Sequence, residues 1–342
     1  MSKKLKKRVQ RLKRKWIDGF LMRGWRFHPS RTMILETTNV CTLKCSCCPN
    51  GAAAAQTLRQ HGMMSRETFD LFLKQLDIPV KQCFLHMCGE PFLNKDLHYF
   101  AEQLLAHKII PVIFSNGYQI DFELLERLLS LKGVVIAFSM DLLSKEHYEQ
   151  IRIPGKYETC LDSLKRINEV FSQRKRFYGL NIILSELTVP ELDTICSRLF
   201  QDYSNLNKIS LSSMWPWPNI PQTGDIAGHL SKSQGFCKRI KELPVVLWNG
   251  DVSFCSFDYS GDLVIGNISE QSLSQLYNAK KTRRIRRHLL MGNLNKEPFC
   301  KNCLLPRYDN YSGILVRNKF NKMTTVERND FFQKVRNYYD RK

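Results

Sequence analysis

The chain has 342 residues, of which 43% are apolar and 25% are charged. This length and composition fit one large globular domain or two joined domains, and exclude a small disulfide scaffold and a disordered chain. No run of roughly 18 apolar residues occurs, and the first residues lack the apolar centre of a secretory signal. We therefore expect a cytoplasmic protein without a transmembrane helix.

The net charge of +20 is concentrated at the two ends of the chain. Residues 1–32 hold 12 Lys and Arg against one acid, and residues 279–342 hold 17 against five. The residues between them hold 23 against 26 and are close to neutral. A polyanion or a membrane surface is therefore a partner for the ends and not for the central body.

Residues 1–31 predict a basic amphipathic helix. Apolar side chains recur every three or four positions among Lys and Arg, at Leu5, Val9, Leu12, Trp16 and Phe20. Such a helix either lies on the body of the protein or rests on an anionic surface. A membrane surface would place the protein at the inner face of the membrane, and a nucleic acid is the less favoured alternative.

Six short apolar runs alternate with helical patterns over residues 32–213. The predicted strands are Met33–Glu36, Cys83–Met87, Pro111–Phe114, Val134–Phe138, Leu180–Leu184 and Lys208–Leu211. The predicted helices are Ser65–Leu76, Asp96–His107, Phe122–Leu131, Tyr157–Phe171 and Pro190–Tyr203. This alternation predicts an α/β fold with a parallel sheet, whose chemistry lies in the loops that follow the strands.

The region after the sixth predicted strand has a different pattern. Residues 214–235 begin with two Trp-Pro pairs, at Trp215 and Trp217, and continue with spaced Gly and Pro, which predicts a linker. The tryptophans are interpreted as packing across the domain junction, with the lining of a substrate opening as the alternative. Asn249-Gly250-Asp251 between two apolar runs predicts a hairpin.

Twelve cysteines in a reducing compartment indicate metal ligands or catalysts before disulfides. Cys41, Cys45 and Cys48 form a Cys-x3-Cys-x2-Cys array directly after the first predicted strand. Three thiolates on one loop can hold three irons of a 4Fe–4S cube and leave the fourth iron open. A structural zinc site would need four protein ligands.

The triad resembles the defining motif of the radical S-adenosylmethionine (SAM) superfamily, and three further segments continue the resemblance. They are Cys88-Gly89-Glu90-Pro91, Ser115-Asn116-Gly117 and Ser139-Met140-Asp141, each at the end of a predicted strand, with Arg152 shortly after. The resemblance implies that Gly89, Glu90 and Pro91 bind the SAM amino group. It also implies SAM contacts by the other segments, at Ser115, Asn116, Ser139, Asp141 and Arg152.

The resemblance also implies the chemistry. The open iron, in a cluster held by Cys41, Cys45 and Cys48, chelates SAM, and an electron cleaves SAM to a 5′-deoxyadenosyl radical. Two departures from the family pattern place the thiols of Cys47 and Cys88 near this radical. They are interpreted as small apolar fillers, with hydrogen-atom donation to a substrate radical as the alternative.

A second group of cysteines lies near the C-terminus. Cys237, Cys255, Cys300 and Cys303 can close a metal site completely, and their spacing alone allows zinc or a 4Fe–4S cluster. Beside a radical SAM barrel the group resembles the SPASM/Twitch auxiliary domain. No cysteine follows Cys303, so the resemblance is to the Twitch form with one auxiliary 4Fe–4S cluster.

The remaining thiols and one histidine are given structural interpretations. Cys83, Cys160 and Cys196 have no partner at motif spacing and are interpreted as core or surface thiols. His86 has the same strand parity as Cys88 and could point into the barrel. A satisfied core histidine is the preferred interpretation, and a catalytic histidine is the alternative.

The expected architecture is a partial (β/α)6 TIM-type barrel of the radical SAM kind followed by a small Twitch auxiliary-cluster domain. The expected boundaries are 1–31 for a basic extension, 32–213 for the barrel, 214–235 for a linker, 236–307 for the auxiliary domain and 308–342 for a second basic extension.

The expected function is oxidation or rearrangement of a C–H bond in a small polar substrate. A sugar or aminocyclitol is preferred to a ribosomally made peptide as the substrate. A lipid-linked glycan is one form that such a sugar could take. The auxiliary cluster would accept the electron, and a flavodoxin or ferredoxin would be the donor, by resemblance. The alternative of another class is a membrane-binding or nucleic-acid-binding protein with structural clusters.

Overall fold

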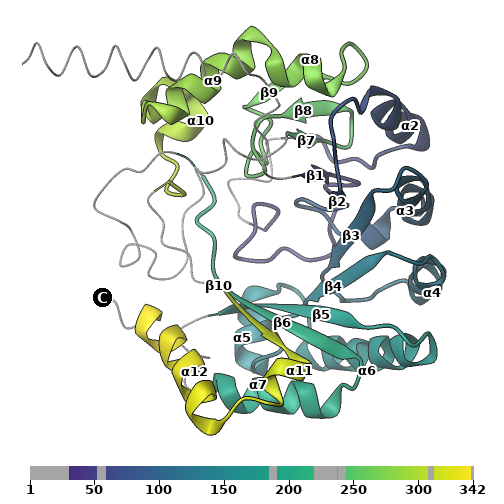
Figure 1. Cartoon of the computed structure of the whole chain (residues 1–342), viewed down its shortest axis with the longest axis vertical. Helices are drawn as coiled ribbons and strands as arrows, with labels where there is room; N and C mark the ends of the chain where they lie inside the picture. Colours follow the sequence, from purple (N-terminus) through teal and green to yellow (C-terminus); the bar gives the residue numbers. More distant parts are fainter. Residues whose placement is uncertain are drawn as a thin grey trace, which may run out of the picture.

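The computed structural model describes residues 31–51, 59–184, 191–218, 237, 244–306 and 312–339. Six parallel strands stand in chain order in a curved sheet (Figure 1). They are β1 (Thr32–Leu35), β2 (Gln82–Phe84), β3 (Ile110–Ser115), β4 (Val135–Ser139), β5 (Tyr178–Leu184) and β6 (Leu206–Ser213). All six predicted strands are present, and the predicted α/β class with a parallel sheet is confirmed.

Helices on the outer side connect these strands. They are α2 (Arg66–Gln75), α3 (Leu97–Ala106), α4 (Phe122–Ser130), α5 (Lys145–Ile151), α6 (Tyr157–Gln173) and α7 (Leu192–Asp202), with a 3-10 turn, η3 (Pro91–Leu93). Side chains of Ser65, Asp121 and Ser144 accept a backbone N–H and so cap α2, α4 and α5. Helix α5 was not predicted, and β2 ends at Phe84 instead of Met87.

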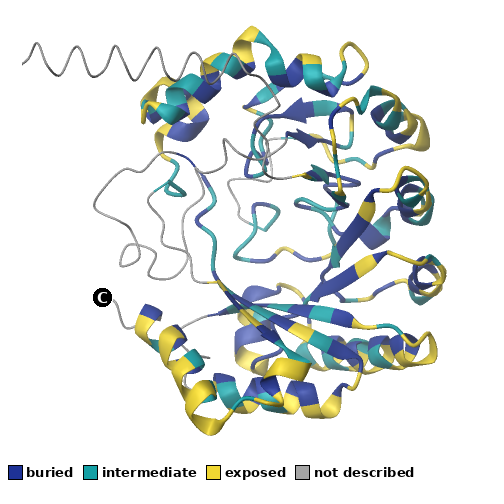
Figure 2. Ribbon diagram, in the orientation of Figure 1, coloured by how far each residue is buried: buried dark blue, intermediate teal, exposed yellow. Residues whose placement is uncertain are grey.

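Side chains along each strand alternate between two environments. In β5, Tyr178 and Leu180 are buried, and the Tyr178 ring contacts Phe171 of α6 at 5.0 Å between centroids. Gly179 and Asn181 are half-buried and face the opposite side, the inside of the partial barrel. In Figure 2, buried and partly accessible segments alternate along the strands of the barrel. The core therefore lies between sheet and helices, and the inside stays partly accessible.

The second part of the chain extends the same sheet. Strand β7 (Val245–Val246) pairs in parallel with β1, and β8 (Asp251–Ser253) and β9 (Val264–Asn267) follow in antiparallel order. The predicted hairpin is present, with Gly250 in the left-handed region at φ +85°. The helical elements after β9 are α8 (Leu273–Asn278), α9 (Lys280–Leu290), η6 (Leu294–Lys296) and α10 (Pro298–Lys301).

Residues near the C-terminus return to the barrel. Strand β10 (Ser312–Val316) pairs antiparallel with β6, and α11 (Arg317–Phe320) and α12 (Thr325–Tyr339) follow it. The described strands form one ten-stranded sheet in the order β10-β6-β5-β4-β3-β2-β1-β7-β8-β9. The predicted extension at 308–342 thus supplies an edge strand of the barrel sheet.

Some sequence-based predictions fall outside the described residues, namely the helix over 1–31 and most of the linker over 214–235. The tryptophans of that linker are described. Trp215 and Trp217 contact Phe257 with ring centroids 5.6 and 4.8 Å apart, which confirms packing across the junction. Across the described ranges, every helix is too short or too polar to span a bilayer.

Candidate active site

The loop that follows β1 carries the first three cysteines. Its backbone is anchored at the end of α5, since the N–H groups of Lys44 and Ser46 donate to the carbonyls of Ile153 and Ile151 at 2.6 and 2.9 Å. The loop over residues 40–51 is therefore positioned by the barrel and not by its own packing alone.

A glycine lets this loop approach the exit of β2. A Cβ atom on Gly89 would lie 2.2 Å from the carbonyl oxygen of Thr38, so only glycine fits there. The side-chain amide of Asn50 donates to the carbonyls of Asn39 and Cys88 at 2.9 and 2.6 Å. The first cysteine loop and the segment around Glu90 therefore form one packed unit.

Two of the three cysteines receive hydrogen bonds from predicted SAM-site residues. The Asn116 amide donates to Cys41 Sγ and the Arg152 guanidinium to Cys45 Sγ, each at 3.6 Å. Burial raises the pKa of Cys41 to about 11 and that of Cys48 well above its usual range. Binding of iron by these thiols would therefore release their protons, and the N–H donors would stabilise the thiolates.

Glu90 is buried at the end of the β2 exit loop. Its carboxylate accepts hydrogen bonds from the backbone N–H groups of Asn116 and Phe92 at 2.7 and 3.1 Å. Burial raises its pKa, and these donors and Ser115 act against that rise. Pro91 begins the turn η3, where its missing N–H leaves no donor unsatisfied. The carboxylate is thus fixed beside the predicted cluster loop.

An ion pair joins the fourth strand to the helix after it. Asp141 is fully buried, and its Oδ2 accepts from Arg152 at 2.7 Å while its Oδ1 accepts from the N–H of Ile183 at 2.6 Å. Ser139 ends β4 and lies in register with Asn181 of β5. The predicted residues at the ends of four strands therefore form two hydrogen-bonded groups. Asn116 joins Cys41 to Glu90, and Arg152 joins Cys45 to Asp141. Their contacts with SAM stay predictions.

The second cysteine group comes from three separate segments. Cys237 precedes the hairpin, Cys255 follows β8, and Cys300 lies in α10 three residues before Cys303. Burial raises the pKa of Cys255 well above its usual range, and the charges of the other three thiols raise it further. Four thiols close enough to affect one another in this way fit a closed cluster site.

A buried carboxylate shapes the loop around Cys255. Asp258 accepts hydrogen bonds from Ser253 Oγ at 2.5 Å and from the backbone N–H of Leu263 at 2.9 Å. The N–H of Phe257 donates to Cys255 Sγ at 3.4 Å. This N–H···S contact resembles the ones at the first cysteine loop and suits a thiolate that ligates iron.

The residues present thus fit two iron–sulfur clusters by their donor chemistry and loop contacts. Within the described part of the chain, no three His, Cys, Asp or Glu side chains are arranged to share a single metal ion. In a 4Fe–4S cube each thiolate binds its own iron.

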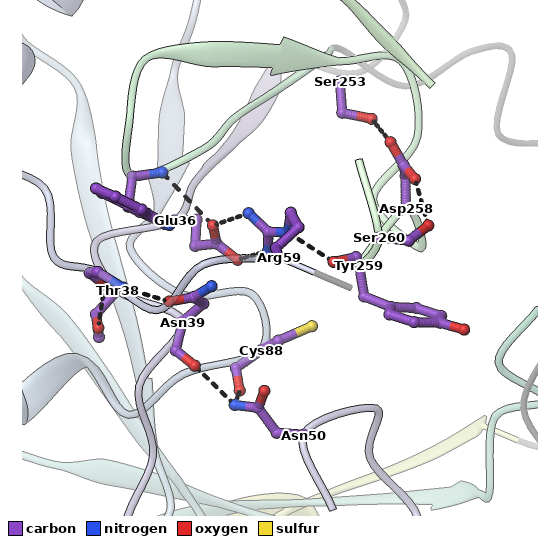
Figure 3. A network of polar contacts seen from close by, with 12 residues as sticks. Glu36, Thr38, Asn39, Asn50, Arg59, Cys88, Ser253, Asp258, Tyr259 and Ser260 are labelled. Carbon is purple, nitrogen blue, oxygen red and sulfur yellow. Dashed lines mark hydrogen bonds and ion pairs between the residues drawn. The ribbon is translucent and has the colours of Figure 1, made fainter. Parts of the chain in front are cut away.

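An ion pair outside the predicted motifs connects the two regions (Figure 3). Glu36, directly after β1, is fully buried and pairs with both guanidinium nitrogens of Arg59 at 2.7 and 2.8 Å. Arg59 Nε also donates to the carbonyl of Tyr259 at 2.6 Å. Sequence reasoning missed this pair because neither residue stands at a motif spacing.

The interpretation of His86 as a satisfied core histidine is wrong. Its Nδ1 is inaccessible and has no hydrogen-bond partner among the described residues, and the residue as a whole is half-buried. The ring lies against Phe84 and Phe114, at 5.5 and 4.8 Å between centroids, on the inner side of the barrel. Burial lowers its pKa to about 4, so the ring is neutral at pH 7.

The three other isolated cysteines are core thiols, as predicted. Cys83, Cys160 and Cys196 are each fully buried in the apolar core. Cys88 is also buried, and burial raises the pKa of its thiol. Whether Cys47 or Cys88 donates a hydrogen atom stays a prediction.

Comparisons with known proteins identify the family. Residues 35–189 match the model of the radical SAM superfamily, and residues 237–304 match the SPASM iron-sulfur cluster-binding domain. Together the two matches cover most of the chain. The chain belongs to the radical SAM superfamily and carries a SPASM-type auxiliary domain.

The individual proteins that the chain resembles share less than a quarter of their residues with it. A curated S-adenosyl-L-methionine-dependent 2-deoxy-scyllo-inosamine dehydrogenase from Niallia circulans is 24% identical over 271 residues, which are 79% of this chain and 90% of that protein. The crystal structure of BtrN in complex with AdoMet and 2-DOIA has a TM-score of 0.53 at 21% identity, covering 80% of this chain and 92% of that one. Streptococcus suis SuiB bound to the precursor peptide SuiA has a TM-score of 0.63 at 14% identity, covering 80% and 75%.

The protein is thus a radical SAM enzyme of the oxidoreductase type. It uses a SAM-binding 4Fe–4S cluster, an auxiliary iron–sulfur cluster and SAM.

Proposed function

We propose that this enzyme oxidises a secondary alcohol of a small polar substrate, an aminocyclitol or a sugar, to a ketone. A hydrogen atom leaves the carbinol carbon, a proton leaves the hydroxyl group, and one further electron is removed. The similarity to an inosamine dehydrogenase supports this reaction, and the polar side chains on the inner surface of the barrel support a polar substrate.

The observation that carries the proposal is a row of polar side chains across three strands. Ser139 of β4, Asn181 of β5 and Ser210 of β6 are in register with one another, so their side chains point to the same side of the sheet. All three are half-buried on the inner side. The Asn181 amide and the Ser210 hydroxyl can bind substrate hydroxyl or amino groups, beside Ser139, whose predicted partner is SAM.

Aromatic side chains from β2 and β3 line the same inner side. Phe84 and Phe114 stack with centroids 5.8 Å apart, and the ring of His86 contacts both. A polyhydroxylated ring has polar edges and apolar C–H faces, so it fits a surface that offers both kinds of contact. A long, apolar substrate would leave the polar row unpaired.

The chain's own residues would bind and orient the reactants. Cys41, Cys45 and Cys48 would hold one cluster, and the cysteines of the SPASM domain would hold the other. When bound, the clusters supply the one-electron chemistry, which cleaves SAM and accepts the electron from the substrate. Glu90 would bind the SAM amino group and Arg152 would keep Asp141 oriented, because burial holds both carboxylates in fixed positions.

The proposed electron donor is an acidic flavodoxin or ferredoxin. Helix α9 has no acidic residue, and its Lys280, Lys281 and Arg284 are exposed. This helix lies beside the segment that leads to Cys300, since His288 pairs with Glu297 at 2.5 Å. Positive charge there would attract an acidic redox protein.

Membrane attachment through residues 1–31 is a separate proposal, and liposome flotation of the full chain tests it.

The test uses anaerobically reconstituted protein, SAM and dithionite, with 2-deoxy-scyllo-inosamine as the probe. We expect about eight irons per chain, 5′-deoxyadenosine, and a product two mass units lighter than the probe. A variant with alanine at the four SPASM-domain cysteines should hold about four irons and still cleave SAM, but should lose the oxidised product. The variant with alanine at Cys41, Cys45 and Cys48 should lose SAM cleavage as well.

Two results would contradict the proposal. SAM cleavage without oxidation of the probe or of related sugars, together with a mass change in a peptide, would make the enzyme a peptide modifier. Wild-type protein that holds about four irons plus zinc would make the second site structural and would point to redox-neutral chemistry.

A further inference from the structure

Arg59 occupies a buried position between the two cysteine-bearing regions. It is the first described residue after the gap at 52–58, and its side chain is only 14% exposed. Burial lowers the pKa of its guanidinium, but the hydrogen bonds and the charge of Glu36 outweigh this and raise it. The charge of Arg59 is therefore permanent and fully paired in a site that excludes most water.

One end of this contact is tied to the first cysteine loop. Glu36 lies five residues before Cys41, and its backbone N–H donates to the carbonyl of Val246 in β7 at 2.8 Å. Its carboxylate binds Arg59 in a bidentate pair, a geometry that fixes both orientation and distance. Movement of Arg59 relative to the start of the first cysteine loop is thus restricted.

The other end is tied to the auxiliary cysteine loop. Arg59 Nε donates to the carbonyl of Tyr259, which lies four residues after Cys255. That short segment is itself rigid, because the N–H of Asp258 donates to the carbonyl of Cys255 at 3.0 Å and the N–H of Phe257 donates to its sulfur. The Arg59 side chain therefore links Glu36 to the loop of Cys255, through a contact with a residue 200 positions further along the chain.

We propose that Arg59 is a positioning residue that holds the loop of Cys255 against the end of β1 and so sets where the auxiliary cluster lies relative to the SAM site. This inference rests on the proposed function, in which the auxiliary cluster accepts an electron from the substrate. A buried ion pair is a weak source of stability, so its directional bonds are its main contribution here.

The experiment compares wild type with Arg59→Met, Arg59→Lys and the control Arg66→Met. Arg66 pairs with Asp96 at 2.6 Å, as Arg59 pairs with Glu36, but its side chain is 56% exposed. Pulsed dipolar EPR of the reduced protein measures the distance between the two clusters. Hydrogen exchange of residues 253–263 is measured in cluster-free protein, and product per 5′-deoxyadenosine is measured with the inosamine probe.

We expect Arg59→Met to broaden the distance distribution and to speed exchange in the Cys255 loop. Product per 5′-deoxyadenosine should fall about tenfold or more, since a misplacement on the order of 1 Å can cost about 100-fold. Arg59→Lys keeps the positive charge beside Glu36 but lacks the planar guanidinium group, whose Nε also donates to Tyr259. It should therefore give an intermediate result. Arg66→Met should match wild type.

An unchanged cluster distance and unchanged loop exchange in Arg59→Met would overturn the positioning role. If Arg59→Met loses iron, Arg59→Lys decides the question by the same two measurements. A wild-type protein that does not oxidise the probe would count against the proposed substrate only, because distance and exchange still report on the contact.

Discussion

At the scale of single residues, the buried carboxylates of the site accept several hydrogen bonds, whereas one histidine has a ring nitrogen that makes none within the described part of the chain. Glu90 and Asp141 have their oxygens occupied by backbone or guanidinium donors. His86 has an inaccessible ring nitrogen without a partner among the described residues. A buried polar atom without a partner lowers stability, by about 1 to 3 kcal/mol.

The pKa of His86 predicts a pH dependence of stability. An unfolded histidine has a pKa of 6.5, and burial lowers it to about 4 in the folded protein. The unfolded chain therefore binds more protons between these values, so the free energy of unfolding falls as pH drops from about 6.5 to about 4. In His86→Phe this contribution is absent.

Urea unfolding at several pH values, with the cluster-free protein, checks this prediction. His86→Phe should lose less stability than wild type between pH 6.5 and pH 4. Parallel curves of unfolding free energy against pH for wild type and His86→Phe would contradict the lowered pKa of His86.

At the scale of elements, Arg317 attaches the C-terminal segment to the barrel. Its guanidinium donates to the carbonyls of Leu206 at 2.7 Å and of Phe200 and Tyr203 at the end of α7. The carbonyls of Phe200 and Tyr203 lie in and directly after the last turn of α7, where carbonyls lack an i+4 helical donor, and a cation at a helix C-terminus is favourable. The side chain therefore caps α7 and fixes α11 at once.

Replacing Arg317 by Met should lower the free energy of unfolding by about 2 to 4 kcal/mol, because more than one carbonyl would lose its donor. Thermal and urea unfolding of the full chain measure this change. Lys319→Met, at an exposed position of the same helix, is the matched control and should change stability by less than about 0.5 kcal/mol. Equal effects of the two substitutions would contradict the cap.

The sequence predicts those elements whose signal is local. Six strands and five helices follow from periodicity within each segment, and the cysteine motifs from spacing within each loop. Helix α5 is too short for a periodic signal, and β10 is defined by pairing with β6, about 100 residues earlier. The Glu36–Arg59 pair and the missing partner of His86 depend on contacts between distant segments, which no local pattern contains.

At the scale of the whole molecule, barrel and auxiliary region share one sheet. The parallel pairing of β7 with β1 continues the hydrogen-bond ladder from one region into the other. The Trp215 and Trp217 rings on Phe257 add apolar contact across the same junction. We therefore expect the two regions to unfold together.

Two probes in urea can check this in cluster-free protein. Three of the five tryptophans, Trp215, Trp217 and Trp248, lie at or near the auxiliary region, so fluorescence reports mainly on it. Far-UV circular dichroism reports mainly on the barrel helices. The two transitions should coincide. Separate midpoints would mean that the shared sheet does not couple the regions.

The place of β10 at the edge of the barrel sheet has a consequence for synthesis on the ribosome. Strand β6 is translated about 100 residues before β10, so its outer edge stays without a partner for roughly 5 to 20 s at ordinary elongation rates. An open strand edge is a template for pairing with other chains. The edge of β6 is thus open to pairing with other nascent chains until residues 312–316 emerge.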